Sequence, residues 1–373
     1  MIESLRLLGV TIEGTLPDLT LEGVRGDFPK KTADLFVGNA GTVARFLTAA
    51  LAFNGGEYRL DGVERMRERP IADLVNALRA MGAGIDYLGR EGFPPIRVAQ
   101  GALATDRVRV RGDVSSQFLT ALLLLAPTLR RRGGFTIEIE GELISRPYVR
   151  MTVEMMRAFG VDVLETERGY FVPAADGYVS PGTYRIEPDA SGASYFFALG
   201  ALTGGPVRVN GLTRDSIQGD VRFLEGLQKM GADVFYGNDF IEVSGNPETP
   251  LKGIEIDCVD IPDAAMTYVP MALCLNGELL LTGIASWRVK ETDRLAALAC
   301  EMRKLGAEVE TGESWIRVRA SHPAGARVAT YNDHRMAMAL SLAACAGIAV
   351  EIENPDCVSK TFPTYFETLK SLA

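Results

Sequence analysis

The spacing of apolar residues predicts a series of amphipathic helices that end in one recurring pattern. A basic or polar residue, an apolar residue, a glycine and a small residue close these helices, with the glycines at Gly9, Gly82, Gly160, Gly231 and Gly306. Glycine takes the left-handed backbone conformation at little cost, so each is expected to cap a helix C-terminus. An alternating segment that is typical of a β-strand follows each glycine, for example at residues 233–236 and 308–311.

A second recurring pattern predicts helices of small residues that begin with polar groups. The copies begin near Gly38, Val114, Asp189, Pro262 and Asn332. The first turn of a helix has backbone N–H groups without partners in the helix, and these can bind an anion. Together the two patterns predict roughly five and a half copies of an α/β unit of about 75 residues.

The repetition predicts an α/β fold of two pseudo-symmetric domains, each built from three units. We place the boundary just before Asp189, which gives an N-terminal domain of residues 1–187 and a C-terminal domain of residues 188–373. The first unit is incomplete, because the helix of small residues that belongs to Gly9 would lie before Met1. A missing segment is one interpretation, and a terminal repeat that is merely imperfect is the other.

Composition narrows the class of protein. Apolar residues make up 47% of the chain and charged residues 23%, which is typical of a globular protein. The net charge of −9 argues against nucleic-acid binding, which needs a basic surface. No apolar stretch is long enough to span a membrane and no secretory signal precedes the first helix, so a cytoplasmic protein is expected. The run at residues 130–134 is expected to be a solvated turn.

The five cysteines form no C-x-x-C pair, and all lie in the second half of the chain. This pattern favours reduced, mostly structural thiols over zinc ligands or disulfides.

Basic residues lie where several helices are predicted to begin. Arg69 precedes Pro70, which suits the first position of a helix. The expected buried stripe of that helix consists of Ile71, Leu74, Val75, Leu78 and Met81. By itself, the segment is also typical of a solvated charge run.

A second cluster lies in residues 287–295. Lys290 and Arg294 are four residues apart, so a helix would place them on one face, with Glu291 beside them. The expected core face of this helix consists of Leu295, Leu298, Met302 and Leu305. Two cations and a carboxylate could bind an anion and move a proton, although an ordinary salt-bridged first turn has the same spacing.

Two further helix starts carry cations. Arg335 follows His334, and Lys360 precedes Pro363 and a helix predicted over residues 362–373. A lone histidine is more often structural than catalytic. Each helix start adds about half a positive charge from the macrodipole. If several starts converge, they form a site for a multiply anionic ligand in spite of the net charge.

With these motifs in order along the chain, the sequence resembles the family of 5-enolpyruvylshikimate-3-phosphate synthases (3-phosphoshikimate 1-carboxyvinyltransferases). The matching segments are residues 38–42 with Arg45, 65–70, 114–120, 145–148, 189–195, 261–267, 287–294, 331–337 and 359–363. The resemblance implies the enolpyruvyl transferase fold, in which two domains of three βαβαββ units close over a cleft. It agrees with the repeat count.

The resemblance also implies a reaction, in which the enolpyruvyl group of phosphoenolpyruvate is transferred to the 5-hydroxyl of shikimate 3-phosphate and phosphate is released. This is a step of the shikimate pathway, which leads to chorismate and the aromatic amino acids. No metal or organic cofactor is implied, and a monomer is expected. Both substrates are anions, which suits arginine forks.

The resemblance further implies roles for individual residues. Asp263 is expected to be the base for the 5-hydroxyl, and Lys290 and Glu291 to transfer protons at the enolpyruvyl methylene. Phosphoenolpyruvate is expected to contact Gly41, Arg69, Gln117, Arg294, Arg335 and Lys360. Shikimate 3-phosphate is expected to contact Ser115, Ser116, Gln117, Ser145, Tyr148, Asp263 and Lys290.

Some features depart from the family pattern. The family begins with a strand and a helix whose Lys-Ser pair and later Arg contact both substrates, and this sequence does not contain that segment. An inactive or partner-dependent homologue that binds shikimate 3-phosphate is therefore the alternative. Ser286 and Phe46 stand where the family often has Asn and Pro. The related transferases that act on UDP-N-acetylglucosamine carry a reactive cysteine in the loop at residues 64–69, and none is present here.

Overall fold

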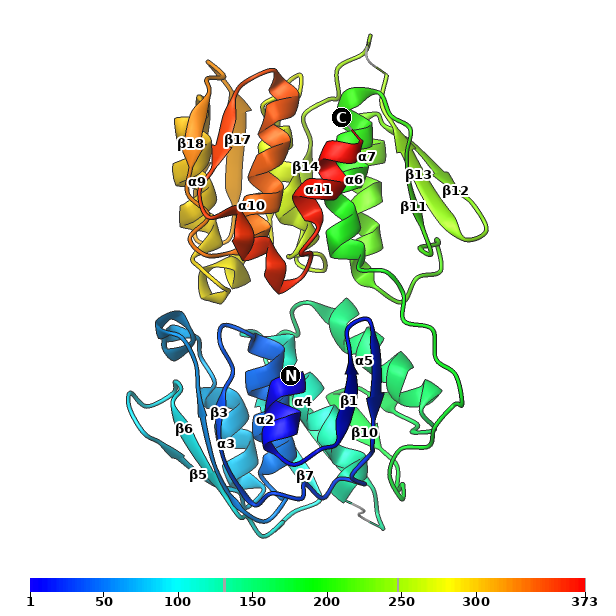
Figure 1. Cartoon of the computed structure of the whole chain (residues 1–373), viewed down its shortest axis with the longest axis vertical. Helices are drawn as coiled ribbons and strands as arrows, with labels where there is room; N and C mark the ends of the chain where they lie inside the picture. Colours follow the sequence, from blue (N-terminus) through cyan, green and yellow to red (C-terminus); the bar gives the residue numbers. More distant parts are fainter. Residues whose placement is uncertain (130–131, 247, 373) are drawn as a thin grey trace. The chain divides into compact units, whose positions relative to one another are not determined.

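The computed structural model describes residues 1–129, 132–246 and 248–372, and the chain divides into two compact units, Met1–Tyr184 and Arg185–Ala373. Figure 1 shows the helices and strands of each unit coloured along the sequence. Arg130 and Arg131, which belong to the predicted solvated turn, lie outside the described residues, as does Ala373 at the end of the last predicted helix.

The first unit contains a short hairpin and two sheets of four strands. The hairpin follows α1 (Ile2–Leu7) and pairs β1 (Ile12–Thr15) with β2 (Asp18–Leu21). The first sheet has the order β3-β4-β6-β5 and the second the order β7-β8-β10-β9. In both sheets the first two strands are parallel and the other neighbours antiparallel, so the same arrangement occurs twice.

The elements of these two sheets alternate along the chain. They are β3 (Thr32–Phe36), α2 (Gly41–Leu51), β4 (Glu57–Asp61), η1 (Glu64–Glu68), α3 (Ala72–Ala80), β5 (Gly84–Tyr87), β6 (Ile96–Ala99), β7 (Arg107–Arg111), α4 (Ser116–Leu125), η2 (Ala126–Leu129), β8 (Phe135–Glu140), α5 (Arg146–Ala158), β9 (Leu164–Thr166) and β10 (Gly169–Val172).

The second unit repeats this arrangement. Its four-stranded sheet has the order β14-β15-β17-β16, again with a parallel first pair, and a three-stranded sheet has the order β11-β13-β12. A parallel pair, β18 with β19, completes the described strands of this unit. The shared topology of the two units confirms that the chain is built from repeated α/β units.

The elements of the second unit are α6 (Ala190–Thr203), β11 (Val207–Asn210), η3 (Gly219–Arg222), α7 (Phe223–Met230), β12 (Asp233–Tyr236), β13 (Phe240–Ser244), β14 (Glu255–Asp257), η4 (Ala264–Thr267), α8 (Tyr268–Met271), β15 (Glu278–Thr282), η5 (Ala285–Val289), α9 (Arg294–Lys304), β16 (Ala307–Thr311), β17 (Ile316–Ala320), β18 (Ala326–Val328), α10 (His334–Ser341), η6 (Leu342–Ala346), β19 (Val350–Ile352), η7 (Pro355–Lys360) and α11 (Tyr365–Ser371).

The recurring glycines terminate helices as predicted. Gly9, Gly82, Gly160, Gly231 and Gly306 all have φ between +76° and +106°, which is the left-handed region. In α7, for example, the Gly231 N–H donates to the carbonyl oxygen of Leu227 and closes the last turn. A residue with a Cβ would be strained at these positions, which explains why the pattern is repeated.

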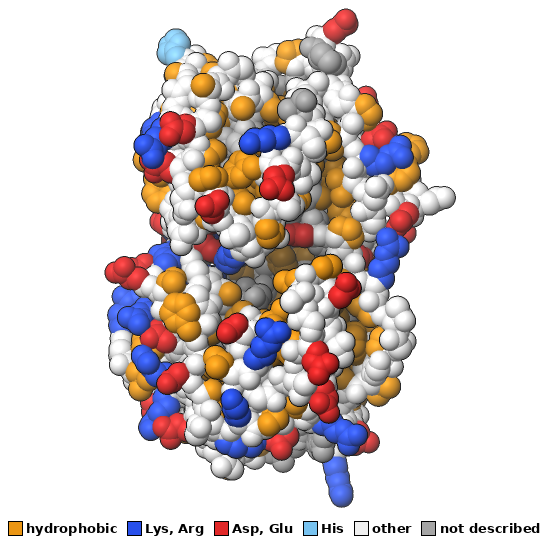
Figure 2. All heavy atoms as spheres, in the orientation of Figure 1, with side chains coloured by type: hydrophobic (Ala, Val, Ile, Leu, Met, Phe, Trp, Pro, Cys, Tyr) orange, Lys and Arg blue, Asp and Glu red, His pale blue; other side chains and the backbone are white. Residues whose placement is uncertain are grey.

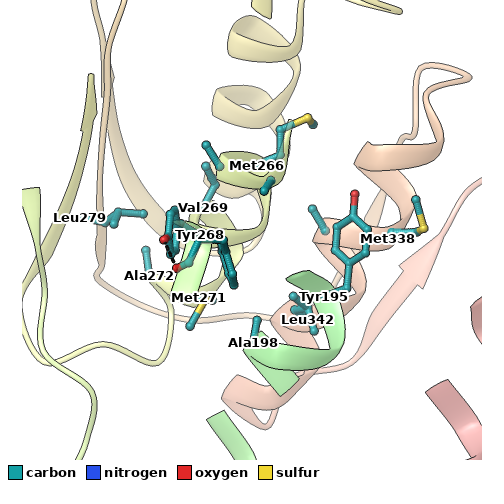
Figure 3. Close-up of a cluster of buried hydrophobic side chains, with 14 of the residues drawn as sticks. Tyr195, Ala198, Met266, Tyr268, Val269, Met271, Ala272, Leu279, Met338 and Leu342 are labelled. Atoms are coloured by element: carbon teal, nitrogen blue, oxygen red, sulfur yellow. Dashed lines mark hydrogen bonds between the residues drawn. The ribbon is translucent and has the colours of Figure 1, made fainter. Parts of the chain in front are cut away.

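The helices of small residues lie inside each unit and form much of its core. In the second unit, α6 is buried on nearly all sides because alanine, glycine and serine allow close packing. Figure 3 shows the core around it, with Tyr195 and Ala198 from α6 and Met338 and Leu342 from the segment 334–346. The other labelled side chains come from η4, α8, the residue that follows α8 and Leu279 of β15.

Two predicted helix starts lie later than the sequence indicates. Pro70 is not the first helical residue, since α3 begins at Ala72. The reason is that Ile71 has φ −137° and donates its N–H to the carbonyl oxygen of Gly92, so it cannot join the helix. The last helix begins at Tyr365 rather than residue 362, because Lys360 and its neighbours form the separate turn η7. The predicted buried stripe of α3 is confirmed.

The surface carries charges of both signs. Figure 2 shows basic and acidic side chains interspersed on the drawn face of the molecule. All five cysteines are free thiols, and in the described part of the chain no helix has the length and apolar character needed to cross a bilayer.

Candidate functional site

In the first unit, the start of α2 holds a buried arginine. Arg69 is 4% exposed, and its Nη1 donates to the backbone oxygen of Asn39 at 2.8 Å and to the side-chain oxygen of Asn39 at 3.1 Å. A Cβ on Gly41 would lie 2.8 Å both from Arg69 Nη2 and from Gln117 Oε1. A contact this short would force one of these side-chain ends to shift, so glycine lets both of them lie close to the first turn of α2.

Arg45 ties α2 to the segment that carries Arg69. Its guanidinium is buried, and Nη2 donates to the carbonyl oxygen of Pro70 at 2.7 Å, while Nη1 lies 3.7 Å from the sulfur of Met66. The residues on both sides of Arg69 are therefore anchored to one helix. This limits the directions in which the Arg69 guanidinium can point.

The starts of α4 and α5 bring a second group of polar residues together. The Ser115 hydroxyl caps α4 by accepting from the Gln117 N–H at 3.3 Å. Ser145, at φ +53°, precedes α5, and Tyr148 lies in the first turn of that helix. A hydrogen bond of 3.2 Å between Thr120 and Thr152 joins the two helices. Ser116 is 9% exposed at the first position of α4.

In the second unit, Asp263 is the meeting point of three cations. Its Oδ1 lies 2.9 Å from Arg294 Nη1 and 3.3 Å from Lys290 Nζ, and its Oδ2 lies 3.2 Å from Arg335 Nη2. Burial raises the pKa of Asp263, but the charges of Lys290, Arg335 and Arg294 more than offset burial, so the pKa lies well below its usual range. Asp263 is ionised at neutral pH.

Arg294 links this group to two further carboxylates. It is 1% exposed, and it donates from Nε to Asp333 Oδ2 at 2.8 Å and from Nη2 to Glu291 Oε2 at 2.9 Å. Glu291 Oε1 also accepts from Lys360 Nζ at 2.5 Å. Burial lowers the pKa of Arg294, but the three carboxylates outweigh it and the pKa is raised. The network joins Lys290, Arg294, Arg335 and Lys360 to Asp263, Glu291 and Asp333.

Lys290 and Arg294 both reach Asp263, but the prediction that they share a helical face is wrong. Lys290 has extended backbone angles after η5, and α9 begins only at Arg294. They are not on one helical face. Asp293 caps α9 by accepting from the Ala296 N–H at 3.0 Å, which forces the preceding residues out of the helix. The shared carboxylate of Asp263 brings the two cations together.

Two residues of this network were not singled out from the sequence. Asp333 is fully buried and caps α10 by accepting from the Arg335 N–H at 2.9 Å. Tyr195 is also buried, and its hydroxyl lies 3.5 Å from Arg335 Nη1. The N-cap position of Asp333 before a helix that carries a site arginine is a pattern that could have indicated it, whereas the contact of Tyr195 is long-range.

His334 does not contribute a charge to the network. Burial and the adjacent charge of Arg335 lower the pKa of His334 to about 3, although Asp333 opposes this shift. The imidazole is neutral at pH 7, and its position in the first turn of α10 makes it a core residue of the second unit.

This fold is the fold of the enolpyruvyl transferases. An EPSP synthase from Acinetobacter baumannii is similar in structure, with a TM-score of 0.77 and 25% identity over 100% of this chain and 86% of that chain. The enolpyruvyl transferase NikO from Streptomyces tendae shares the fold, with a TM-score of 0.74 at 18% identity, over 99% of this chain and 85% of the other.

The sequence comparisons are more specific. The family model for EPSP synthase (3-phosphoshikimate 1-carboxyvinyltransferase) matches residues 1–369, and the chain belongs to this family. A 3-phosphoshikimate 1-carboxyvinyltransferase of Ralstonia pickettii is 54% identical over 98% of this chain and 86% of its own length. One from Cellvibrio japonicus is 54% identical over 100% of this chain and 87% of its own length.

Proposed function

We propose that this protein transfers the enolpyruvyl group of phosphoenolpyruvate to the 5-hydroxyl of shikimate 3-phosphate and releases phosphate. Membership of the EPSP synthase family across residues 1–369 is the observation that carries the proposal. The geometry of the second unit supports it, because four cations around three carboxylates suit ligands that carry several negative charges.

The cations of the second unit bind the carboxylate and phosphate of phosphoenolpyruvate. Arg294, Arg335 and Lys360 each donate to a carboxylate, and these bonds order their side chains. An incoming anion therefore exchanges one set of ion pairs for another and loses little side-chain entropy. The family resemblance also assigns contacts with phosphoenolpyruvate to Gly41, Arg69 and Gln117.

Shikimate 3-phosphate binds to hydroxyl and amide groups at the starts of α4 and α5. Ser115, Ser116, Gln117, Ser145 and Tyr148 lie there, and hydroxyl groups can both donate to a phosphate and accept from a sugar-like hydroxyl. Backbone N–H groups in the first turns of the two helices add positive potential for the phosphate. Asp263 and Lys290 contact the hydroxyl that reacts.

Asp263 removes the proton from the 5-hydroxyl, and the hydroxyl oxygen adds to C2 of phosphoenolpyruvate. In the same step Lys290, whose Nζ lies 3.3 Å from Asp263 Oδ1, delivers a proton to the methylene carbon. Glu291 takes part in the proton transfer at this carbon. Lys290 then takes a proton back from the resulting methyl group, phosphate leaves and the double bond is restored. Binding of substrate anions to Arg294 and Arg335 weakens their hold on Asp263, which raises its pKa and makes it a better base.

We further infer that the protein comprises two domains of three units, divided between residues 187 and 188. The division of the chain into two compact units at Tyr184 and Arg185 lies close to this boundary and supports it.

A phosphate-release assay tests the activity. The protein is mixed with both substrates and with each one alone, and steady release only in the complete mixture is expected. Isothermal titration with each substrate accompanies the assay. Binding of shikimate 3-phosphate without phosphate release in the complete mixture would overturn the proposal.

A further inference from the structure

Helix α9 carries a second buried charge two turns after Arg294. Glu301 is fully buried, and its carboxylate accepts four hydrogen bonds. Oε1 accepts from Lys304 Nζ at 2.9 Å and from the Tyr331 hydroxyl at 2.7 Å. Oε2 accepts from Lys304 Nζ at 2.7 Å and from the Ala329 backbone N–H at 3.0 Å. One helix therefore holds both Arg294 and the segment at residues 329–331.

The Glu301 carboxylate is ionised. Burial raises its pKa, but the bonds from Lys304, Tyr331 and Ala329 more than offset burial, so the pKa lies below the usual value. A buried charge is costly and persists where every oxygen is paired. Only one of the three donating residues, Lys304, lies on the same helix, and the other two belong to the segment that leads to α10.

That segment has an unusual backbone. Tyr331 and Asn332 have φ values of +52° and +54°, so two consecutive residues other than glycine are left-handed. Such conformations persist only where the surroundings hold them. The Asp333 N–H donates to the carbonyl oxygen of Thr330 at 2.9 Å, which closes a tight turn directly before α10.

We propose that Glu301 is a positioning residue for the cations that bind phosphoenolpyruvate, and this rests on the proposed function. By holding Ala329 and Tyr331, Glu301 fixes the turn that presents Asp333. The Asp333 carboxylate then lies 2.8 Å from Arg294 Nε and 2.9 Å from the Arg335 backbone N–H. Glu301 itself touches no substrate. It acts through the turn on the directions of both guanidinium groups.

The variant Tyr331→Phe tests this most cleanly, because the Tyr331 side chain is 42% exposed and its loss leaves the core intact. It removes one hydrogen bond of Glu301 and loosens the turn. The KM for phosphoenolpyruvate is expected to rise about tenfold, the equivalent of one lost hydrogen bond. The kcat and the KM for shikimate 3-phosphate are expected to change less than about twofold. Glu301→Gln, which cannot accept all four bonds, is expected to raise the same KM further.

Lys304→Met is the matched control. It removes the exposed partner of Glu301 and leaves the bonds to Ala329 and Tyr331. Its KM for phosphoenolpyruvate is expected to stay within about twofold of the unsubstituted protein. A similar rise in this control, or a lower melting temperature in Tyr331→Phe with all kinetic constants unchanged, would overturn the positioning role.

A readout without substrate separates this proposal from the proposed function. Hydrogen exchange of the backbone amides of Asp333 and Arg335 is expected to be about tenfold faster in Tyr331→Phe than in the unsubstituted protein, while amides in α6 are unchanged. Equal exchange at these two amides contradicts the positioning role even if the enzyme is active. Absence of phosphate release by the unsubstituted protein overturns the proposed function, and the exchange comparison still decides the role of Glu301.

Discussion

The two units hold their candidate site arginines in different ways. In the first unit, the hydrogen bonds that position Arg69 come from the backbone and side-chain oxygens of Asn39, and the missing Cβ of Gly41 makes room for it. In the second unit, Arg294 is positioned by Asp263, Glu291 and Asp333, all of them carboxylates. The described hydrogen bonds of Arg69 go to neutral acceptors beside a closely packed glycine, whereas those of Arg294 are ion pairs in a buried site.

The two arrangements should be sensitive to different kinds of substitution. Neutral hydrogen bonds contribute modestly, whereas a buried ion left without its partner costs several kilocalories. The first unit should therefore respond most to changes of shape, and the second to changes of charge.

The largest effect is expected for Asp333→Asn. The amide carries no charge to pair with Arg294, which is 1% exposed and keeps Asp263 and Glu291, so the free energy of unfolding should fall by about 2–3 kcal/mol. The matched variant in the first unit is Asn39→Ala, for which a loss of about 1 kcal/mol is expected. Urea denaturation measures both. Equal losses would remove the distinction between the two arrangements.

Lys290→Ala should affect catalysis more than stability. Lys290 is partly exposed and makes an ion pair with Asp263, so the fold should tolerate its loss. The turnover number is expected to fall by about 10²–10³-fold, as for the loss of a donor at the reacting atoms. The phosphate-release assay measures this, with Lys229→Ala, at an exposed position of α7, as the control. A near-normal rate in Lys290→Ala would refute the role of Lys290.

Stability should depend on pH in the second unit more than in the first. The pKa of His334 is lowered from 6.5 to about 3 in the folded protein. Below pH 6.5 the unfolded chain binds a proton that the folded chain does not, so stability falls as the pH drops. Between pH 7 and pH 5 the loss is about 2 kcal/mol. Both histidines, His322 and His334, lie in the second unit.

Hydrogen exchange at pH 7 and pH 5, corrected for the intrinsic rates, measures the two units separately. The loss should be confined to the second unit and should disappear in His334→Gln. A loss of the same size in both units, or one that survives in His334→Gln, would show that another group is responsible.

The smallest effect is expected for Gly41→Ala. The added Cβ would lie 2.8 Å from Arg69 Nη2 and Gln117 Oε1, and both are ends of flexible side chains that can move aside. The KM for phosphoenolpyruvate should rise about tenfold or less, with little change in stability. Gly23→Ala is the control, since a Cβ there meets no atom within 4 Å. If the KM for phosphoenolpyruvate is unchanged in Gly41→Ala, the shape of the site around Gly41 does not control the binding of this substrate.

Much of the fold could be predicted from local pattern. The glycines at positive φ, the buried stripes of α3 and α9 and the strands after each glycine follow from the spacing of residues. The helix starts were less accurate, because Ile71 is kept out of α3 by a bond to Gly92, and Lys290 is kept out of α9 by the Asp293 cap. The spacing of four residues between Lys290 and Arg294 fits two arrangements. Both residues can lie on one face of a helix, or both can reach Asp263 without sharing a helix.

The repeated α/β units, the family and the candidate site residues of each unit follow from the sequence alone. The reason is that the periodicity, the positions of the glycines and the order of the motifs are local properties of the chain. Only the tertiary structure decided which carboxylate pairs with which cation. Asp333, Tyr195 and Glu301 join the network through contacts with residues 28 to 140 positions away, and no local pattern encodes such distances. Burial then decides how much each of these pairs matters, since an ion pair is strong only where water is excluded.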